Sequence, residues 1–167
     1  MAATVSVKEV NGADAGSATT ITNLRFKTKD ETTQDENYTL LKPDADVNYS
    51  FKKTIFLNAD TAPAGTINNI KFFCDGEIGW TGVDVKGLPA DAYVQATGTE
   101  SVSGDELEDA VDIETYTSAS PLSLTGSITT PDTGKISQYL ELQAIIGVTA
   151  GPGALAQETC TFRYDET

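Results

Sequence analysis

The sequence predicts an all-β protein, folded as a single antiparallel β-sandwich of the jelly-roll or immunoglobulin-like kind with about eight to ten strands. Three observations lead to this prediction. Apolar and polar residues alternate with a period of two in several runs, and clusters of Gly, Pro, Asn and Asp separate those runs. The chain has 167 residues, of which 39% are hydrophobic. This length suits one core and is short for two, so residues 1–167 are expected to form one domain.

The clearest strand signal lies near the C-terminus. Residues 140–148 place Leu, Leu, Ala, Ile and Val at every second position, which predicts a long strand with one buried face. Gly-Pro-Gly at 151–153 then interrupts the pattern, and a second alternating run follows at 159–164. Together these two runs predict a C-terminal hairpin.

Two further runs predict strands in the middle of the chain. Residues 47–57 alternate in the same way, and only Lys53 stands at an apolar position, where its aliphatic stem could snorkel at a sheet edge. Residues 67–74 form another alternating run, which stops at the turn dipeptide Asp75-Gly76. We expect these two strands to be neighbours.

Weaker patterns predict the remaining elements. Short strands are expected at 4–10, 20–27, 82–86, 92–96, 113–117 and 122–128. Residues 28–46 and 97–112 are polar and irregular, and we expect them to form long loops at the ends of the sandwich. A helix is expected only at 106–111, and it would be about two turns long.

The charge balance limits the partners that the protein can have. Eleven basic residues against twenty-five acidic ones give a net charge of −14. Because such a surface repels phosphates and anionic lipids, we expect no nucleic acid and no membrane among the partners. No stretch approaches the roughly 18 apolar residues of a membrane span, and the first residues lack the pattern of a signal peptide. The expectation is a soluble protein made in the cytoplasm.

The chain contains no histidine, the usual general base and the commonest metal ligand. This excludes Ser-His-Asp and Cys-His catalysis. The densest acidic cluster lies within residues 104–114, but its spacing fits no EF-hand loop, so a solvated acidic loop is favoured over a calcium site. We therefore predict no enzyme activity, no catalytic residue, no cofactor and no metal.

The two cysteines, Cys74 and Cys160, are too far apart in sequence to form a CxxC unit or a zinc knuckle. The favoured interpretation is two buried free thiols. A disulfide between strands that are adjacent in space stays open as the alternative.

Two aromatic residues are candidates for a contact surface. Trp80, the only tryptophan, lies among glycines after a strong strand, and an exposed Trp there could anchor a partner. The favoured interpretation, however, is a Trp folded back over the end of the sandwich. As an alternative function, Trp80 and Tyr93 could stack on sugar rings, as in a carbohydrate-binding or host-adhesion module.

Four segments carry a resemblance to known proteins. These are VSVKEVNGA at 5–13, TNLRFKT at 22–28, NYSFKK at 48–53 and ETCTFRYDE at 158–166. They resemble a group of small virion proteins of tailed bacteriophages, and the resemblance runs nearly from end to end. It implies a structural component of the virion. We prefer a capsid decoration or accessory head protein to a tail or neck component, because an acidic surface suits the outside of a shell better than its DNA-facing interior.

The resemblance also implies partners. Such a protein would bind the major capsid protein or other virion proteins and form a homo-oligomer in the assembled particle. Residues 1–10 are expected to include an extended N-terminal arm. Its Val5 and Val7 could take part in adding a strand to the open edge of a neighbouring subunit.

Overall fold

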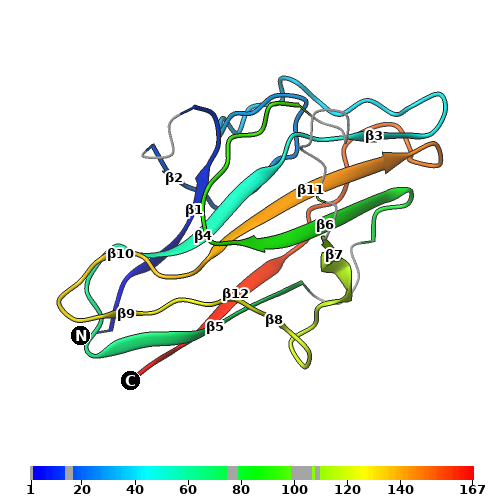
Figure 1. The fold of residues 1–167 in the computed structure, drawn as a ribbon. Helices are drawn as coiled ribbons and strands as arrows, with labels where there is room; N and C mark the ends of the chain where they lie inside the picture. Colours follow the sequence, from blue (N-terminus) through cyan, green and yellow to red (C-terminus); the bar gives the residue numbers. More distant parts are fainter. Residues whose placement is uncertain (1, 14–16, 75–78, 99–106, 108–109) are drawn as a thin grey trace.

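The computed structural model describes residues 2–13, 17–74, 79–98, 107 and 110–167, and it contains two antiparallel sheets (Figure 1). The first sheet has the main order β2-β1-β4-β11-β6-β7, while β10 also pairs with β4 and β3 with β11. Its strands are β1 (Val5–Val10), β2 (Thr19–Thr20), β3 (Val47–Tyr49), β4 (Lys53–Ala59), β6 (Val83–Ala90), β7 (Val111–Asp112), β10 (Gly134–Lys135) and β11 (Tyr139–Gly147).

The second sheet is smaller and is built around one long strand. Its strands are β5 (Thr66–Cys74), β8 (Leu122–Ser123), β9 (Ile128–Thr129) and β12 (Cys160–Glu166). The short strands β8 and β9 pair with one edge of β5, and β12 pairs with the other edge along its whole length. In Figure 1 these strands lie below the first sheet, and the two termini lie at the same end of the molecule.

The main core forms where the two sheets face each other. Ile55 and Leu57 of β4 pack in one cluster with Ile70 and Phe72 of β5, and all four side chains are buried. The period-two alternation of these strands places one apolar row of each sheet in this layer. Each such buried side chain contributes about 1.5–3 kcal/mol of transfer free energy.

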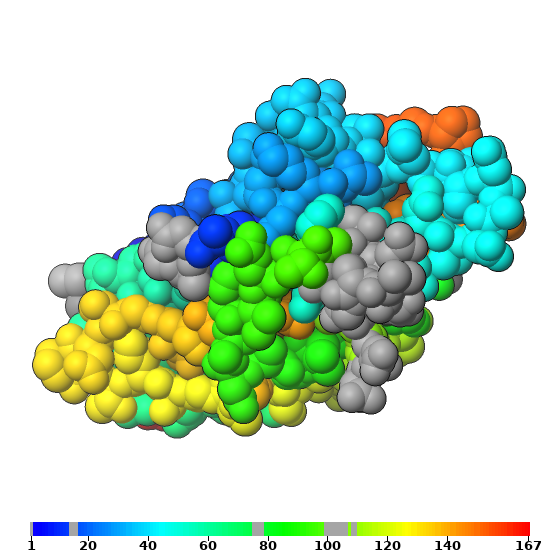
Figure 2. Space-filling model, turned by 45° about the horizontal axis from the view of Figure 1, so that its top comes forward, coloured from blue at the N-terminus to red at the C-terminus, as the bar shows by residue number. Residues whose placement is uncertain are grey.

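The outer face of the first sheet is also covered. All residues of β4 are buried, including Phe56, whose ring packs edge-to-face on Tyr139 at 5.4 Å. Tyr93, from the segment after β6, lies against Tyr139 with the ring centroids 6.4 Å apart. The chain that follows β6 therefore forms a third layer over the centre of this sheet, as the green segment in Figure 2 shows.

A long segment without strands, residues 21–46, covers the part of the inner face that the second sheet does not reach. We call it the covering segment. Its residues Phe26 and Leu40 pack against a second cluster that contains Val83, Ala144 and Ile146. In Figure 2 the covering segment, blue to cyan, stands out as a raised lobe.

The structure confirms the all-β antiparallel sandwich. The described residues form twelve strands, more than the eight to ten expected, because five of the twelve are only two residues long. The strongest sequence patterns gave the longest strands: the run at 67–74 is β5, and the run at 140–148 is β11.

The predicted strand neighbours were wrong in two places. Strands β11 and β12 do not form a hairpin, because β11 belongs to the first sheet and β12 to the second. Likewise β4 and β5 lie in different sheets and face each other across the core. Alternation determines which face of a strand is buried, but it does not specify the strand that pairs with it.

Several weaker strand predictions were also wrong or only partly right. The run at 47–57 is divided between β3 and β4. The patterns at 20–27 and 92–96 form no strand apart from Thr20, which belongs to β2. In the strand expected at 113–117, residues 113–115 instead form a 3₁₀ turn capped by Asp112. Residues 106, 108 and 109 of the helix expected at 106–111 lie outside the described residues, and residue 111 begins β7. The turn at 75–76 lies entirely outside the described residues.

Candidate functional site

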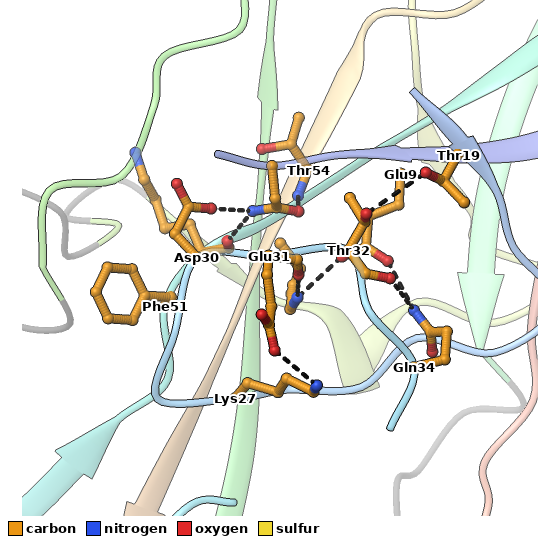
Figure 3. Close-up of polar contacts among 12 residues, drawn as sticks. Glu9, Thr19, Lys27, Asp30, Glu31, Thr32, Gln34, Phe51 and Thr54 are labelled. Carbon is orange, nitrogen blue, oxygen red and sulfur yellow. Dashed lines mark hydrogen bonds and ion pairs between the residues drawn. The ribbon is translucent and has the colours of Figure 1, made fainter. Parts of the chain in front are cut away.

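A network of charges with a buried centre connects the first sheet to the covering segment (Figure 3). At its centre Lys53 Nζ lies 2.9 Å from Glu9 Oε1, and both side chains are 0% exposed. The other carboxylate oxygen of Glu9 accepts a hydrogen bond from Gln34 Nε2 at 3.0 Å, and Lys53 also donates to the carbonyl oxygen of Glu31. Both charges of the pair are therefore satisfied within the protein.

The second half of the network lies within the covering segment. Lys27, which is buried, has its Nζ 2.9 Å from Glu31 Oε1 and 2.6 Å from Asp35 Oδ1. Lys29 Nζ reaches the other oxygen of Glu31 at 2.9 Å. Glu31 therefore joins the two halves, because its side chain binds Lys27 and Lys29 while its backbone carbonyl binds Lys53.

The environment shifts the pKa values of these acids in opposite directions. Burial raises the pKa of Glu9 above its usual 4.5, although the charge of Lys53 opposes the rise. Hydrogen bonds from Lys29 and then Lys27 lower the pKa of Glu31, and a hydrogen bond from Lys27 lowers that of Asp35. Each charge in the network has a fixed partner of opposite sign, so the arrangement serves to fasten the covering segment to the sheet.

A half-open cavity of about 940 Å³ lies between the first sheet, the second sheet and the covering segment. Leu142 and Ile146 of β11 line it from one sheet, and Phe72 and Phe162 line it from the other. Apart from Glu158, the charged residues in its lining all belong to the covering segment. The volume lies within the range of about 300–1,000 Å³ found for small-molecule sites, and the lining suits apolar groups.

Trp80 is half-buried and also lines this cavity. Its ring packs against both hydrophobic clusters, and its indole Nε1 donates a hydrogen bond to the carbonyl oxygen of Ala156 at 2.7 Å. The Trp is therefore folded back over the end of the sandwich, where it holds the segment 150–158 in place. This agrees with the favoured interpretation and not with the exposed Trp anchor, because packing and one hydrogen bond already engage this ring.

Tyr93 is engaged at the other end of β6. Its hydroxyl donates a hydrogen bond to the carbonyl oxygen of Gly12 at 2.7 Å, and burial raises its pKa. Tyr93 contacts Tyr139, which pairs with Ala90 at the end of β6. Trp80 lies at the start of β6, where its carbonyl oxygen accepts a hydrogen bond from the amide of Val83. An eight-residue strand spans about 25 Å at roughly 3.3 Å per residue. The structure therefore does not bring Trp80 and Tyr93 into one sugar-binding surface.

The first residues are part of the sheet and do not form a free arm. Val5 and Val7 are half-buried and stand opposite Ala59 and Leu57 of β4. The amide of Ala3 donates to both carboxylate oxygens of Glu166, at 3.1 and 3.2 Å. The expected arm at 1–10 was wrong, because this alternating strand finds its partner within its own chain.

Cys74 and Cys160 form a disulfide between β5 and β12, where the two residues are directly opposite in register. The expectation of two buried free thiols was wrong, and the alternative that had been left open is correct. Cys74 is buried and Cys160 is exposed. Sequence could not identify the pair, because it did not show that β12 lies beside β5.

The acidic cluster at 104–114 is described only in part. Asp112 accepts hydrogen bonds from the amide of Glu114 at 3.1 Å and from Lys86 Nζ at 3.2 Å. In the part of the chain that the structure describes, no group of three or more His, Cys, Asp or Glu residues is arranged to hold a metal ion. The other acidic members lie outside the described residues. No helix among the described residues is both long and apolar enough to cross a membrane.

Three exposed apolar side chains gather at one end of the first sheet. Leu41, Val47 and Val148 are 68%, 41% and 45% exposed, and we call them the apolar tip. Val47 stands opposite Gly147, the neighbour of Val148, and the side chain of Asn48 donates to the carbonyl of Leu41 at 2.8 Å. A cavity of about 360 Å³ opens beside Leu41 and Val47. Exposed apolar surface of this kind is typical of contact sites.

Sequence reasoning missed both the charge network and the apolar tip. The network did leave a signal: Glu9 continues the alternation of Val5 and Val7, and Lys53 precedes that of Ile55, so each strand places one charge on its buried face. Opposite charges at such positions indicate a buried pair. The tip left no comparable signal, because its three residues come from three separate segments.

Comparisons with known proteins add no further identification. The chain matches no known protein family, no curated protein and no solved structure.

Proposed function

We propose that the protein is a structural building block of a tailed-phage particle, and specifically an accessory head protein that binds the outside of the capsid shell and stabilises it. Its partners would be the major capsid protein or other virion proteins, and it would act by contact without catalysing a reaction. The sequence resemblance to small virion proteins supports this class of function.

The apolar tip is the observation that carries the proposal. Leu41, Val47 and Val148 expose apolar surface at the end of the molecule. Val47 lies in β3, which pairs with β11, and Val148 directly follows the last residue of β11. The covering segment that carries Leu41 is fixed by the buried charge network. Rigid presentation lowers the entropy lost on binding, which favours a contact surface of this kind.

The distribution of charge supports a position on the outside of the shell. Lys27, Lys52 and Lys53 are buried, so three of the eleven basic residues contribute little to the surface, whereas only Glu9 and Glu141 are buried among the described acidic residues. The exposed surface is therefore more strongly acidic than the composition alone indicates. Such a surface is repelled by packaged DNA.

Reconstitution on capsids tests the proposal. Shells purified from particles that lack this protein are incubated with the purified chain and then sedimented, and bound protein is located by immunogold labelling. We expect labelling over the shell surface, and we expect Leu41→Asp or Val148→Asp to abolish it, because a charge in an apolar contact is not compensated. The control Val94→Asp changes a side chain that is 61% exposed but lies away from the tip, and it should bind normally.

The same preparation separates head from tail. Labelling of free tails or necks, with none on shells, would replace the head assignment with a tail or neck component. Protein that stays in the supernatant with both fractions would contradict a structural role in the particle.

A further inference from the structure

The outer edge of β12 is open. Within the described ranges, β12 lies at the end of the second sheet and its strand partner is β5. Native proteins usually protect such edges with proline, a bulge or charged side chains, and the exposed charged residues of β12, Arg163 and Asp165, are of opposite sign. β12 contains no proline, and its irregularity near Arg163 and Asp165 places the extra residue on β5, where Asn69 has a φ of 52°. The edge therefore stays regular.

The register shows which backbone groups point out of the sheet. Thr167 and Thr66 exchange hydrogen bonds of 2.9 and 3.0 Å, whereas the amide of Cys74 bonds to Tyr116, away from Cys160. In an antiparallel pair, bonded and non-bonded positions alternate. The odd-numbered residues of β12 therefore bond to β5, and the amides and carbonyls of Phe162, Tyr164 and Glu166 face outward.

We propose that this edge pairs with the β12 edge of a second copy of the chain, in antiparallel orientation and with Tyr164 opposite Tyr164 of the second copy. In this arrangement Phe162 of each copy stands opposite Glu166 of the other, and these outward-facing backbone groups bond directly. The exposed residues Arg163 and Asp165 then lie opposite each other across the interface, twice by symmetry. They occupy non-bonded positions, where side chains approach closest.

The charges select this register over its neighbours. Moving the second copy by two residues in one direction would place Arg163 of one copy opposite Arg163 of the other. Moving it by two residues in the opposite direction would place Asp165 of one copy opposite Asp165 of the other. Like charges directly opposite each other are destabilising, and opposite charges are favourable. Arg163 forms no ion pair with any residue in the described parts of the chain, and its guanidinium contacts the carbonyl of Ser118 at 3.3 Å. The proposal is independent of attachment to a capsid.

A charge swap tests the pairing. Arg163→Asp places two acids opposite each other, and Asp165→Arg places two arginines opposite each other, so each variant should weaken the dimer about tenfold or more. The double variant Arg163→Asp/Asp165→Arg restores opposite charges and should restore dimerisation. Sedimentation equilibrium of the full chain measures this. The control Lys42→Asp makes the same change of charge on the covering segment and should have no effect on the dimer beyond general repulsion.

Cysteine crosslinking tests the register without depending on affinity. Under mild oxidation, a mixture of Arg163→Cys and Asp165→Cys chains should give a disulfide-linked heterodimer, while Arg163→Cys alone should not crosslink to itself. A monomeric wild-type chain throughout the accessible concentration range would overturn the proposal. A dimer that is insensitive to both single charge changes, or self-crosslinking of Arg163→Cys alone, would overturn it as well. Circular dichroism confirms that each variant is folded.

Discussion

Glu9 and Lys53 form an ion pair that is completely removed from solvent, with Nζ and Oε1 2.9 Å apart. The pair joins β1 to β4 diagonally on the inner face of the first sheet, because Glu9 stands opposite Ile55 and Lys53 lies two residues before Ile55. Each member also binds the covering segment, Glu9 through the side chain of Gln34 and Lys53 through a backbone carbonyl. A buried pair of this kind adds little net stability over an apolar pair, but it positions the groups around it. Its role is therefore to determine where the covering segment lies.

We predict that Lys53→Met destabilises the protein by about 3–5 kcal/mol, because it leaves the Glu9 carboxylate buried without a counter-charge. Glu9→Met/Lys53→Met removes both charges and should recover much of this loss. The control Lys8→Met breaks a partly exposed pair with Asp60 and should cost about 1 kcal/mol or less. Urea unfolding measures all three. If Lys53→Met were no worse than Lys8→Met, the pair would not be buried as the structure has it.

Acid should affect the two ends of the network in opposite ways. The pKa of Glu31 is lowered in the folded state. Its contribution to folding stability is therefore present above the usual pKa of 4.5 and is lost as pH falls through the folded pKa. The pKa of Glu9 is raised, so its contribution is largest below 4.5 and is lost as pH rises through the folded pKa. We predict that the stability difference between wild type and Glu31→Gln shrinks below pH 4.5. For Glu9→Gln, the stability of the variant relative to wild type should improve as pH rises. Thermal unfolding across this pH range measures both differences, and equal slopes would contradict the assignment.

The longest strands were predictable because one face of each is buried. β5 and β11 were recognisable from their alternation alone, since burial on one side of a sheet requires that pattern. The partners of strands were not predictable in the same way. The connection between β11 and β12 crosses from one sheet to the other, and the local sequence at 151–153 marks a turn whether or not the chain returns to the same sheet. Pairing depends on residues distant in sequence, which an alternation pattern cannot report.

The candidate sites were less predictable than the fold for a related reason. Lys53 was expected to extend its head to solvent at a sheet edge, but the structure buries it in contact with Glu9, 44 residues earlier in the chain. Trp80 and Tyr93 were grouped because both are aromatic, yet β6 separates them. A residue's type indicates which contacts it can make, and only the three-dimensional arrangement decides which of them it does make.

The disulfide between Cys74 and Cys160 should contribute substantially to stability. It closes a loop with a sequence separation of 86 residues, and the loop-entropy relation gives about 4–5 kcal/mol for a loop of this length. We predict that Cys160→Ser lowers the free energy of unfolding by an amount of this order and that a reducing agent does the same to the wild type. Unfolding of the variant should not change further on reduction. Labelling of two thiols in the native, unreduced protein would contradict the disulfide.

Trp80 should control the mobility of the segment 150–158. Trp80→Phe keeps an aromatic ring but removes the hydrogen bond to the carbonyl of Ala156, at a cost of about 0.5–1.5 kcal/mol. We predict faster thermolysin cleavage before Leu155, which is already exposed, and a small loss of stability. Tyr93→Phe removes a hydrogen bond at the other end of β6 and serves as the control. Cleavage at Leu155 that responds equally to both variants would show that Trp80 does not hold this segment.

A glycine in the connection between β8 and β9 should tolerate no side chain. Gly126 has a φ of 130°, and a Cβ atom there would lie 2.0 Å from the carbonyl oxygen of Ile136. Ile136 belongs to the connection between β10 and β11. This connection is held against the one between β8 and β9, because the amide of Gln138 donates a hydrogen bond to the carbonyl of Thr125 at 2.7 Å. Neither backbone can move away without breaking this contact between the sheets. We predict that Gly126→Ala costs about 1–3 kcal/mol or more in urea unfolding. Gly151→Ala, where no heavy atom lies within 4 Å, should be neutral or slightly stabilising. Equal effects of the two substitutions would show that the connections do not approach as closely as the structure places them.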